Sequence, residues 1–460
     1  MRVVRSLSLG LFVVVVLVVA GCSSTGPAQT YVTGDWHGNI EFPGQPLAVG
    51  INFTTDGKGS IEVPVQGIAD KQLSAVRNEV DRVEFSIPEF PGQPTFEGKY
   101  DKASDSIKGD FTQSGKTVPL NLTRGQAATP ARPQEPKPPW PYKSEDVSYH
   151  SGNITIAGTL TEPQTGGPHP AVLLITGSGA QDRNEEILGH KSFLLWADTL
   201  TRAGYAVLRT DDRGVGGTGG DLADSSYQDL TGDIGAGVAF LHGRSEIDGK
   251  RIGLLGHSEG GYLAPLYASQ PDSGVAFAIL QAGPAVTGAD VLLEQNRLIL
   301  TASGAPPEQV AAQVGYISGL TSVIRNGDLA AAKVYAQQHN DSLPADQRAS
   351  GETIDAMVTP YMAALINYDP APALSALRVP VLAMFGTKDL QVPAAQSEGP
   401  MRSLLAADPD ATVQVFDGLN HLMQPATTGL PSEYGTIETT IDPQVLDYVA
   451  AWLTKRFPTH

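Results

Sequence analysis

The chain has 460 residues, 41% of them hydrophobic, and a formal net charge of −18 at pH 7. This length predicts two folded units with connections between them. The acidic balance disfavours nucleic acid and bare anionic membrane surfaces as partners. Cys22 is the only cysteine, which excludes a disulfide bond within the monomer.

The N-terminus has the pattern of a targeting segment. Arg2 and Arg5 supply positive charge, and residues 9–20 form an apolar stretch that is too short to span a bilayer comfortably. Residues 19–22 (Val-Ala-Gly-Cys) resemble bacterial lipoprotein signals. The resemblance implies export, cleavage before Cys22, and a lipid anchor on Cys22 that holds the protein on the outer face of a bacterial cell membrane, or of the outer membrane if there is one. The alternative is a plain secretory signal with an incidental cysteine.

Residues 31–125 show hydrophobic side chains at alternate positions. The clearest alternating runs are residues 47–53, 83–87 and 107–111, and turn signals such as Asp56-Gly57 separate them. Short strands at this spacing predict a small antiparallel all-β domain, either a barrel or a sandwich. No charged constellation in this segment has the appearance of a catalytic site.

Six prolines between residues 130 and 141 predict a stiff, extended linker. An antiparallel pair is expected near residues 147–160, and apolar runs then alternate with helical patterns. Those runs are residues 171–176, 206–210, 251–256, 275–281, 379–385 and 412–416. The alternation predicts a mainly parallel sheet that helices cover on both faces. Between about residues 284 and 376 it stops, and helical periods rich in Ala, Leu and Gln predict an inserted cap.

The strongest motif is Gly-His-Ser-Glu-Gly at residues 256–260, a G-x-S-x-G pentapeptide centred on Ser258. It lies between the apolar run 251–255 and a helical stretch over residues 261–270. A strand, a sharp turn with a serine at its apex and a helix form the nucleophile elbow of an α/β-hydrolase. The glycines are needed because bulky neighbours would clash in this strained turn.

Two downstream loops can activate Ser258. A serine hydroxyl needs a base, normally a histidine held by a carboxylate, and the α/β-hydrolase order is Ser, then Asp or Glu, then His. Asp389 follows the strand-like run 380–385, at the end of a strand where ligands bind in open α/β sheets. His421 lies on the loop after the last strand. The expected catalytic residues are therefore Ser258, Asp389 and His421.

Acyl transfer also needs donors for the developing oxyanion. One expected donor is the backbone N–H of Glu259, directly after the nucleophile. The second is expected in the glycine-rich stretch 175–182, at Ser178 with Gly179 close behind. The side chain of Glu259 is expected to tune the pocket or to pair with an arginine.

Several other polar residues are expected to have structural roles. Asp212 and Arg213 are expected to brace loops around the site, with substrate binding by Arg213 as the alternative. The side chain of His257 should point away from that of Ser258, and His190 either lines the pocket or caps a helix. No metal-type cluster is apparent, and neither a metal nor an organic cofactor is implied.

From about Val147 to its end the chain resembles the α/β-hydrolase superfamily. Four motifs carry the resemblance, at residues 177–183, 212–216, 256–261 and 389–393. Together they are similar to exported bacterial esterases of the dienelactone-hydrolase or prolyl-oligopeptidase type that carry an extra N-terminal β domain. The chain departs from this group at Ala180, where related loops often carry proline, and at Gly217-Thr218.

The expected organisation is a small all-β domain followed by an α/β-hydrolase domain with a helical cap. The boundaries are residues 1–21 for the signal, 22–30 for a tether, 31–125 for the β domain, 126–143 for the linker and 144–460 for the hydrolase domain, with the cap at about 284–376. The expected function is a carboxylesterase that cleaves small-molecule esters through an acyl-enzyme. The alternatives are a serine peptidase, amidase or acyltransferase with the same triad, or a lipid-anchored binding protein whose hydrolase part is inactive.

Overall fold

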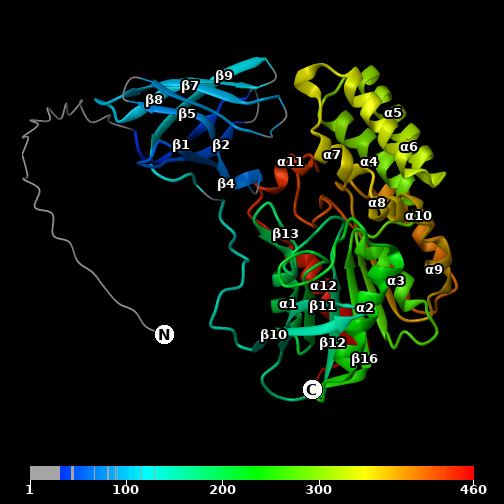
Figure 1. Cartoon of the computed structure of the whole chain (residues 1–460). Helices are drawn as coiled ribbons and strands as arrows, with labels where there is room; N and C mark the ends of the chain where they lie inside the picture. The colour runs from blue at the N-terminus through cyan, green and yellow to red at the C-terminus, as the bar shows by residue number, and fades with distance from the viewer. Residues whose placement is uncertain are drawn as a thin grey trace, which may run out of the picture.

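The computed structural model describes residues 32–42, 46–66, 68–79, 82–88, 90, 92–113, 115–128 and 130–459. The expected signal, the tether and Cys22 lie outside the described residues. Figure 1 shows a smaller β body, a larger body containing a sheet with helices, and a group of helices beside the smaller one. Within the ranges described, no helix is both long enough and apolar enough to cross a membrane.

The smaller body is one antiparallel sheet in the order β4-β3-β2-β1-β9-β8-β7-β6-β5. Its strands are β1 Gly34–Ile40, β2 Leu47–Phe53, β3 Gly59–Val63, β4 Ile68–Gln72, β5 Ser74–Glu79, β6 Arg82–Ser86, β7 Thr95–Asp101, β8 Ser106–Gln113 and β9 Lys116–Arg124, with the 3-10 turn η1 at Pro64–Gln66. Because β4 and β5 are consecutive in sequence yet lie at opposite ends of the order, the sheet curls into a nearly closed barrel. Alternate residues such as Trp36, Phe53 and Phe96 fill its interior. The predicted antiparallel all-β domain is confirmed.

The larger sheet has the order β10-β11-β15-β12-β16-β17-β18-β19. Its strands are β10 Lys143–Ser151, β11 Ile154–Glu162, β12 His169–Ile175, β15 Ala206–Thr210, β16 Ile247–His257, β17 Phe277–Gln281, β18 Val381–Gly386 and β19 Ala411–Phe416; β13 Glu186–Ile187 and β14 His190–Lys191 form a separate ribbon. The first two strands are antiparallel and the rest run parallel from β15 onward. This arrangement is the predicted α/β-hydrolase sheet.

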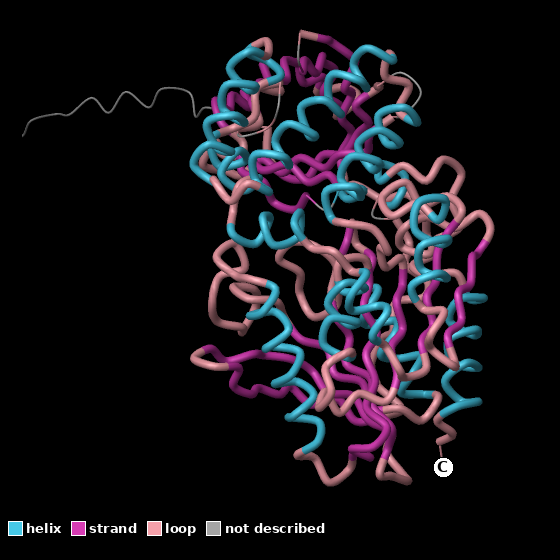
Figure 2. Tube along the Cα trace, turned by 90° about the vertical axis from the view of Figure 1, so that its right-hand side faces the viewer, coloured by secondary structure: helices cyan, strands magenta, loops and turns pink. Residues whose placement is uncertain are grey.

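Helices cover both faces of this sheet (Figure 2). On one face α1 Ser192–Arg202 and α12 Pro443–Arg456 share a core with alternate strand residues such as Val172 and Leu174. On the other face α2 Tyr227–His242, α3 Gly260–Ala268 and α10 Ala394–Leu404 contribute to a second core, which contains Leu173 and Ile175. The parallel strands are therefore buried on both sides, which explains why they read as continuous apolar runs.

The cap is inserted between β17 and β18. It comprises α4 Gly288–Ala302, α5 Pro307–Arg325, α6 Leu329–Ser342, η2 Ala345–Gln347, α7 Gly351–Met357 and α8 Pro360–Asn367, and α9 Ala371–Ala376 follows. Leu320, Ile324 and Ile354 belong to a separate apolar core of the cap. Leu374 of α9 instead packs into the core of the sheet, so α9 ties the cap to the hydrolase body.

The linker is fastened to the hydrolase domain by Arg132. Its guanidinium donates to the carbonyl oxygens of Leu188, Gly189, Gly435 and Ile437 at 2.7–3.2 Å. Gly435, which directly follows α11 Pro431–Tyr434, also approaches the barrel: a Cβ built on it would lie 1.9 Å from the carbonyl oxygen of Val65. Linker and barrel therefore meet the same loop of the hydrolase domain.

Candidate active site

Ser258 occupies a tight turn between β16 and α3. Its φ is +53°, a value that costs energy for a residue with a side chain. The turn leaves no room at either flanking glycine: a Cβ on Gly256 would lie 2.0 Å from the carbonyl oxygen of Gly260, and a Cβ on Gly260 would lie 2.3 Å from that of Ile175. The two glycines are thus required by close backbone packing, and the turn presents the serine at the carboxyl edge of the sheet.

Asp389 and His421 meet at the same edge. Asp389 follows β18, His421 follows β19, and Asp389 Oδ2 lies 2.9 Å from His421 Nδ1. The second carboxylate oxygen of Asp389 accepts the N–H groups of Gln391 and Val392 at 2.8 and 2.9 Å. The fixed carboxylate accepts the Nδ1 proton and leaves Nε2 of His421 free to act as a base.

The nucleophile elbow contacts this pair through His257, the residue before Ser258. The ring centroid of His257 lies 4.8 Å from that of His421. Within the described residues, however, the hydroxyl of Ser258 makes no hydrogen bond to the His421 ring. Catalytic hydrogen bonds are often long in the absence of substrate and tighten when it binds.

His257 points away from the pocket and lies between two loops. Its Nδ1 is 2.8 Å from Glu185 Oε1, and its Nε2 is 3.2 Å from the carbonyl oxygen of His421. Because both nitrogens face acceptors, the doubly protonated, cationic imidazole is the form that satisfies both of them. Burial alone lowers the pKa of His257, but the Glu185 carboxylate outweighs it, so that the pKa is raised. The ion pair thus supports the backbone of His421.

The expected oxyanion loop follows β12 and passes close to the nucleophile. A Cβ built on Gly177 would lie 3.4 Å from Ser258 Cβ. The N–H of Gly177 donates to Glu185 Oε1 at 2.8 Å, and the N–H of Gly179 donates to the hydroxyl of Tyr361 at 2.9 Å. The N–H of Ser178, between them, and that of Glu259 have no acceptor among the described residues. The geometry favours Ser178 over Gly179 as the second donor.

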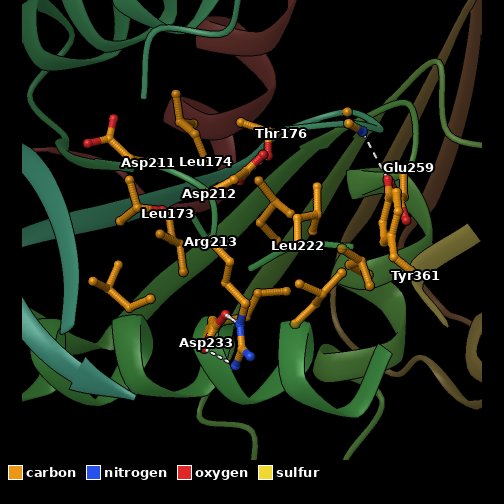
Figure 3. Close-up of a pocket in the computed structure, with 18 of the residues that line it drawn as sticks. Leu173, Leu174, Thr176, Asp211, Asp212, Arg213, Leu222, Asp233, Glu259 and Tyr361 are labelled. Atoms are coloured by element: carbon orange, nitrogen blue, oxygen red, sulfur yellow. Dashed lines mark hydrogen bonds and ion pairs between the residues drawn. The ribbon is translucent and has the colours of Figure 1, made fainter. Parts of the chain in front are cut away.

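The polar residues around the loop brace it, as expected. Asp212 accepts from the hydroxyl of Thr176 and the N–H of Gln181 at 2.8 and 2.9 Å, and burial raises its pKa to about 7. Arg213 is held by both carboxylate oxygens of Asp233 at 2.6 and 3.0 Å. Its guanidinium is therefore paired with Asp233 (Figure 3).

The expectation for His190 was wrong, and one of the two roles expected for Glu259 is not found. Glu259 pairs with no arginine among the described residues; instead its Oε2 accepts a short hydrogen bond from the hydroxyl of Tyr361. Burial raises the pKa of Glu259 to about 7. His190 neither lines the pocket nor caps a helix through its side chain: it is buried, 2.9 Å from Thr440 Oγ1, and burial lowers its pKa to about 4.

A pocket of about 730 Å³ opens beside Ser258. Residues of the oxyanion loop and of the nucleophile elbow line one side. The cap supplies apolar side chains on the other, namely Val291, Leu292, Met362 and Leu365. A smaller cavity of about 70 Å³ lies behind the oxyanion loop, where Asp212, Glu259 and Tyr361 meet Leu222 (Figure 3). In the described part of the chain, no group of three or more His, Cys, Asp or Glu side chains could hold a metal ion.

The sequence analysis does not identify Tyr361 as a functional residue. In the structure Tyr361 lines both cavities and contacts the oxyanion loop and the nucleophile elbow at once. Nothing in the local sequence marks it, since its partners lie 182 and 102 residues away along the chain.

Comparison with known proteins agrees with the fold. The relative EstD, an esterase of Thermotoga maritima, is 25% identical over 358 residues, which cover 78% of each chain. The putative hydrolase YtaP of Bacillus subtilis is 32% identical over 117 residues, or 22% of this chain and 39% of its own length.

Solved structures align at lower identity. The esterase Pf2001 of Pyrococcus furiosus aligns with a TM-score of 0.44 at 16% identity, over 71% of this chain and 97% of its own. The proline iminopeptidase of Mycobacterium smegmatis aligns with a TM-score of 0.43 at 17% identity, over 68% of this chain and 98% of its own.

A family model described as serine aminopeptidase, S33 matches residues 191–424, just over half of the chain. The matched segment includes the elbow at Ser258 and both loops that carry Asp389 and His421. The chain therefore belongs to the serine aminopeptidase S33 family of α/β-hydrolases, and it is a hydrolase.

Proposed function

We propose that the protein is a serine esterase that cleaves carboxylic esters through an acyl-enzyme. The observation that carries the proposal is the 2.9 Å contact between Asp389 and His421 at the edge of the sheet where the elbow presents Ser258. The similarity to the esterase EstD also supports it.

In the proposed mechanism, His421 Nε2 takes the proton of the Ser258 hydroxyl as Oγ attacks the ester carbonyl. Asp389 holds the imidazole in the required tautomer and stabilises the imidazolium. The N–H groups of Glu259 and Ser178 stabilise the oxyanion. The imidazolium then protonates the leaving alcohol, and a water molecule, activated in the same way, hydrolyses the acyl-enzyme.

The lining of the larger pocket supports an uncharged, apolar acyl group as the substrate portion under the cap. On the cap side, the aliphatic and thioether side chains of Val291, Leu292, Met362 and Leu365 line the pocket beside the polar groups of Gln295, Thr359 and Tyr361. Arg213 also lines the pocket, but its positive charge is neutralised by Asp233. Its guanidinium is therefore not free to bind a substrate carboxylate. A cavity of this size accommodates a short or medium chain.

An aminopeptidase activity is the second candidate. The description of the family favours it, and the carboxylate of Asp221 lies on the wall of the pocket, where it could meet the ammonium group of a peptide N-terminus. Turnover of p-nitrophenyl esters compared with aminoacyl p-nitroanilides separates the two activities. We expect the esters to be cleaved with the higher kcat/KM.

A fluorophosphonate probe with peptide mapping tests the nucleophile. We expect stoichiometric labelling of Ser258, and loss of labelling and of ester turnover in Ser258→Ala. Ser269→Ala, at the far end of α3, is the matched control and should be labelled like the unmodified protein. Labelling at another serine would overturn the assignment.

We also propose that the protein is exported and anchored through lipid on Cys22. The charge and apolar pattern of residues 1–22 supports this proposal. Metabolic labelling with a fatty acid should mark the full chain and not Cys22→Ala. A soluble, unlabelled product from both would contradict it.

A further inference from the structure

The oxyanion loop is anchored on both sides of Ser178. Gly177 donates its N–H inward to Glu185, and Gly179 donates its N–H to Tyr361 on the cap. The first anchor belongs to the hydrolase body, next to β16. The second comes from α8, an element inserted more than a hundred residues later in the chain. The orientation of the Ser178 N–H is therefore fixed in part by the cap.

Tyr361 is itself held firmly. It follows Pro360 in the first turn of α8, where the side chain of Thr359 accepts the N–H of Met362 at 3.1 Å and so caps the helix. The N–H of Tyr361 donates to the carbonyl oxygen of Ala223 at 3.1 Å. With 5% of its surface exposed, Tyr361 has little freedom to move independently of α8.

The hydrogen bonds of the Tyr361 hydroxyl have a defined direction. The N–H of Gly179 can only donate, so the phenol oxygen accepts from it, and the single phenol proton is then directed to Glu259 Oε2. Figure 3 shows the hydroxyl pointing toward the loop from the far side of the small cavity. Gly179 has a φ of +91°, in the left-handed region that favours glycine.

We propose that Tyr361 is a positioning residue for catalysis: docked with the cap, it holds residues 177–179 so that the Ser178 N–H faces the oxyanion. The inference rests on the proposed esterase function. Its consequence is that the catalytic site is complete only when α8 is docked on the loop. The cap then has a role in the rate of acyl transfer as well as in lining the substrate pocket.

The test is Tyr361→Phe in the full chain, with Tyr368→Phe as matched control. Tyr368 is a half-buried tyrosine just after α8. Its hydroxyl lies 3.5 Å from the carbonyl oxygen of Tyr262 and makes no contact with the oxyanion loop among the hydrogen bonds described. We expect kcat for p-nitrophenyl butyrate to fall about 10- to 100-fold in Tyr361→Phe. This decrease is smaller than the one expected when a whole oxyanion donor is removed. KM should stay within about twofold, because substrate contacts are retained. Tyr368→Phe should keep its kcat.

Two further readouts separate positioning from general damage. Hydrogen exchange at the Gly179 amide should speed up in Tyr361→Phe and not in Tyr368→Phe, because only Tyr361→Phe removes the hydroxyl that accepts this N–H. Glu259→Leu should also lower kcat, and the double variant Tyr361→Phe/Glu259→Leu should be no slower than the worse single variant, since both break one chain of hydrogen bonds.

Unchanged kcat and unchanged Gly179 exchange in Tyr361→Phe would overturn the inference, as would losses that multiply in the double variant. Failure of the esterase proposal looks different: the unmodified protein would then show neither ester turnover nor labelling at Ser258.

Discussion

His257 Nε2 lies 3.2 Å from the carbonyl oxygen of His421, so the residue before the nucleophile supports the loop that carries the proposed base. The same ring is paired with Glu185, which in turn accepts the N–H of Gly177 in the oxyanion loop. One buried ion pair therefore holds both the base loop and the oxyanion loop against the elbow.

Removing only the cation of this pair should be strongly destabilising. In His257→Leu the Glu185 carboxylate stays buried without its partner, and we expect the free energy of unfolding to fall by about 3–5 kcal/mol. The double variant His257→Leu/Glu185→Gln removes the charge yet retains an oxygen that accepts the N–H of Gly177. It should be clearly more stable than His257→Leu in urea denaturation. A double variant no more stable than the single one would argue against a buried ion pair.

Asp389→Asn tests the orientation of His421. The amide oxygen can still accept the N–H groups of Gln391 and Val392, so that the turn should survive. The group facing His421 Nδ1 would become a donor, which favours the wrong tautomer. We expect kcat for a short ester to fall about 10⁴-fold with little change in the melting temperature. Asp417→Asn, a nearby exposed residue that accepts from Thr387 at 2.9 Å, is the control and should keep its kcat.

The fold and the elbow could be predicted from the sequence because they depend on local pattern. Hydrophobic residues at alternate positions predict the barrel strands, and continuous apolar runs predict the parallel strands. The Gly-x-Ser-x-Gly motif at a strand–helix junction predicts the turn at Ser258. Asp389 and His421 were located the same way, each by its place directly after an apolar run. Their joint role with Ser258 stays a prediction, as do the domain boundaries.

The supporting contacts could not be predicted, because each joins segments far apart in the chain. Glu185 lies 72 residues from His257, and Tyr361 lies 102 residues from Glu259. Such pairs are set by how the cap and the β13–β14 ribbon pack. Helical periods predict the cap, but they do not show which loop it packs against. The missing ion pair of Glu259 has the same origin: Arg213 lines the same two cavities, but it is paired with Asp233.

Glu259 should make stability depend on pH. Burial raises its pKa from 4.5 to about 7, so the folded protein binds more protons than the unfolded chain between these values. The free energy of unfolding therefore falls as pH rises through this window. Glu259→Gln removes the effect, and we expect it to gain up to about 3 kcal/mol over the unmodified protein above pH 7 and nothing below pH 4.5.

Melting temperatures measured from pH 4 to 9 check the Glu259 prediction. Asp212, whose pKa is also raised, in part by the charge of Glu259, is present in both proteins, so the difference between the curves reports Glu259 together with its coupling to Asp212. Glu352→Gln, at an exposed position of α7, should leave the curve unchanged in shape. Parallel curves for Glu259→Gln and the unmodified protein would contradict a buried, protonated Glu259.

Leu292 on α4 should limit the length of the acyl group. Leu292→Trp fills part of the apolar side of the pocket, and each methylene that is displaced from it loses about 0.8 kcal/mol of burial. We expect kcat/KM for octanoyl esters to fall at least about 10-fold, a loss of two such methylenes, while acetyl esters change little. Val334→Trp, at an exposed position of the cap, is the control. An equal loss on both esters would show that Leu292 does not contact the acyl chain.

Arg132 should contribute to stability through geometry that lysine cannot supply. Its planar guanidinium donates to four carbonyl oxygens from two loops at once, whereas an ammonium group has three donors at one point. We expect Arg132→Ala to lower the free energy of unfolding by at least about 3 kcal/mol, because hydrogen bonds to charged donors are worth about 1.5–3 kcal/mol each and are not additive. Arg132→Lys should recover only a small part of the loss, and Arg325→Ala, at an exposed helix end, should have almost no effect. Full recovery by lysine would show that charge alone, rather than the fork of donors, fastens the linker to the loop after α11.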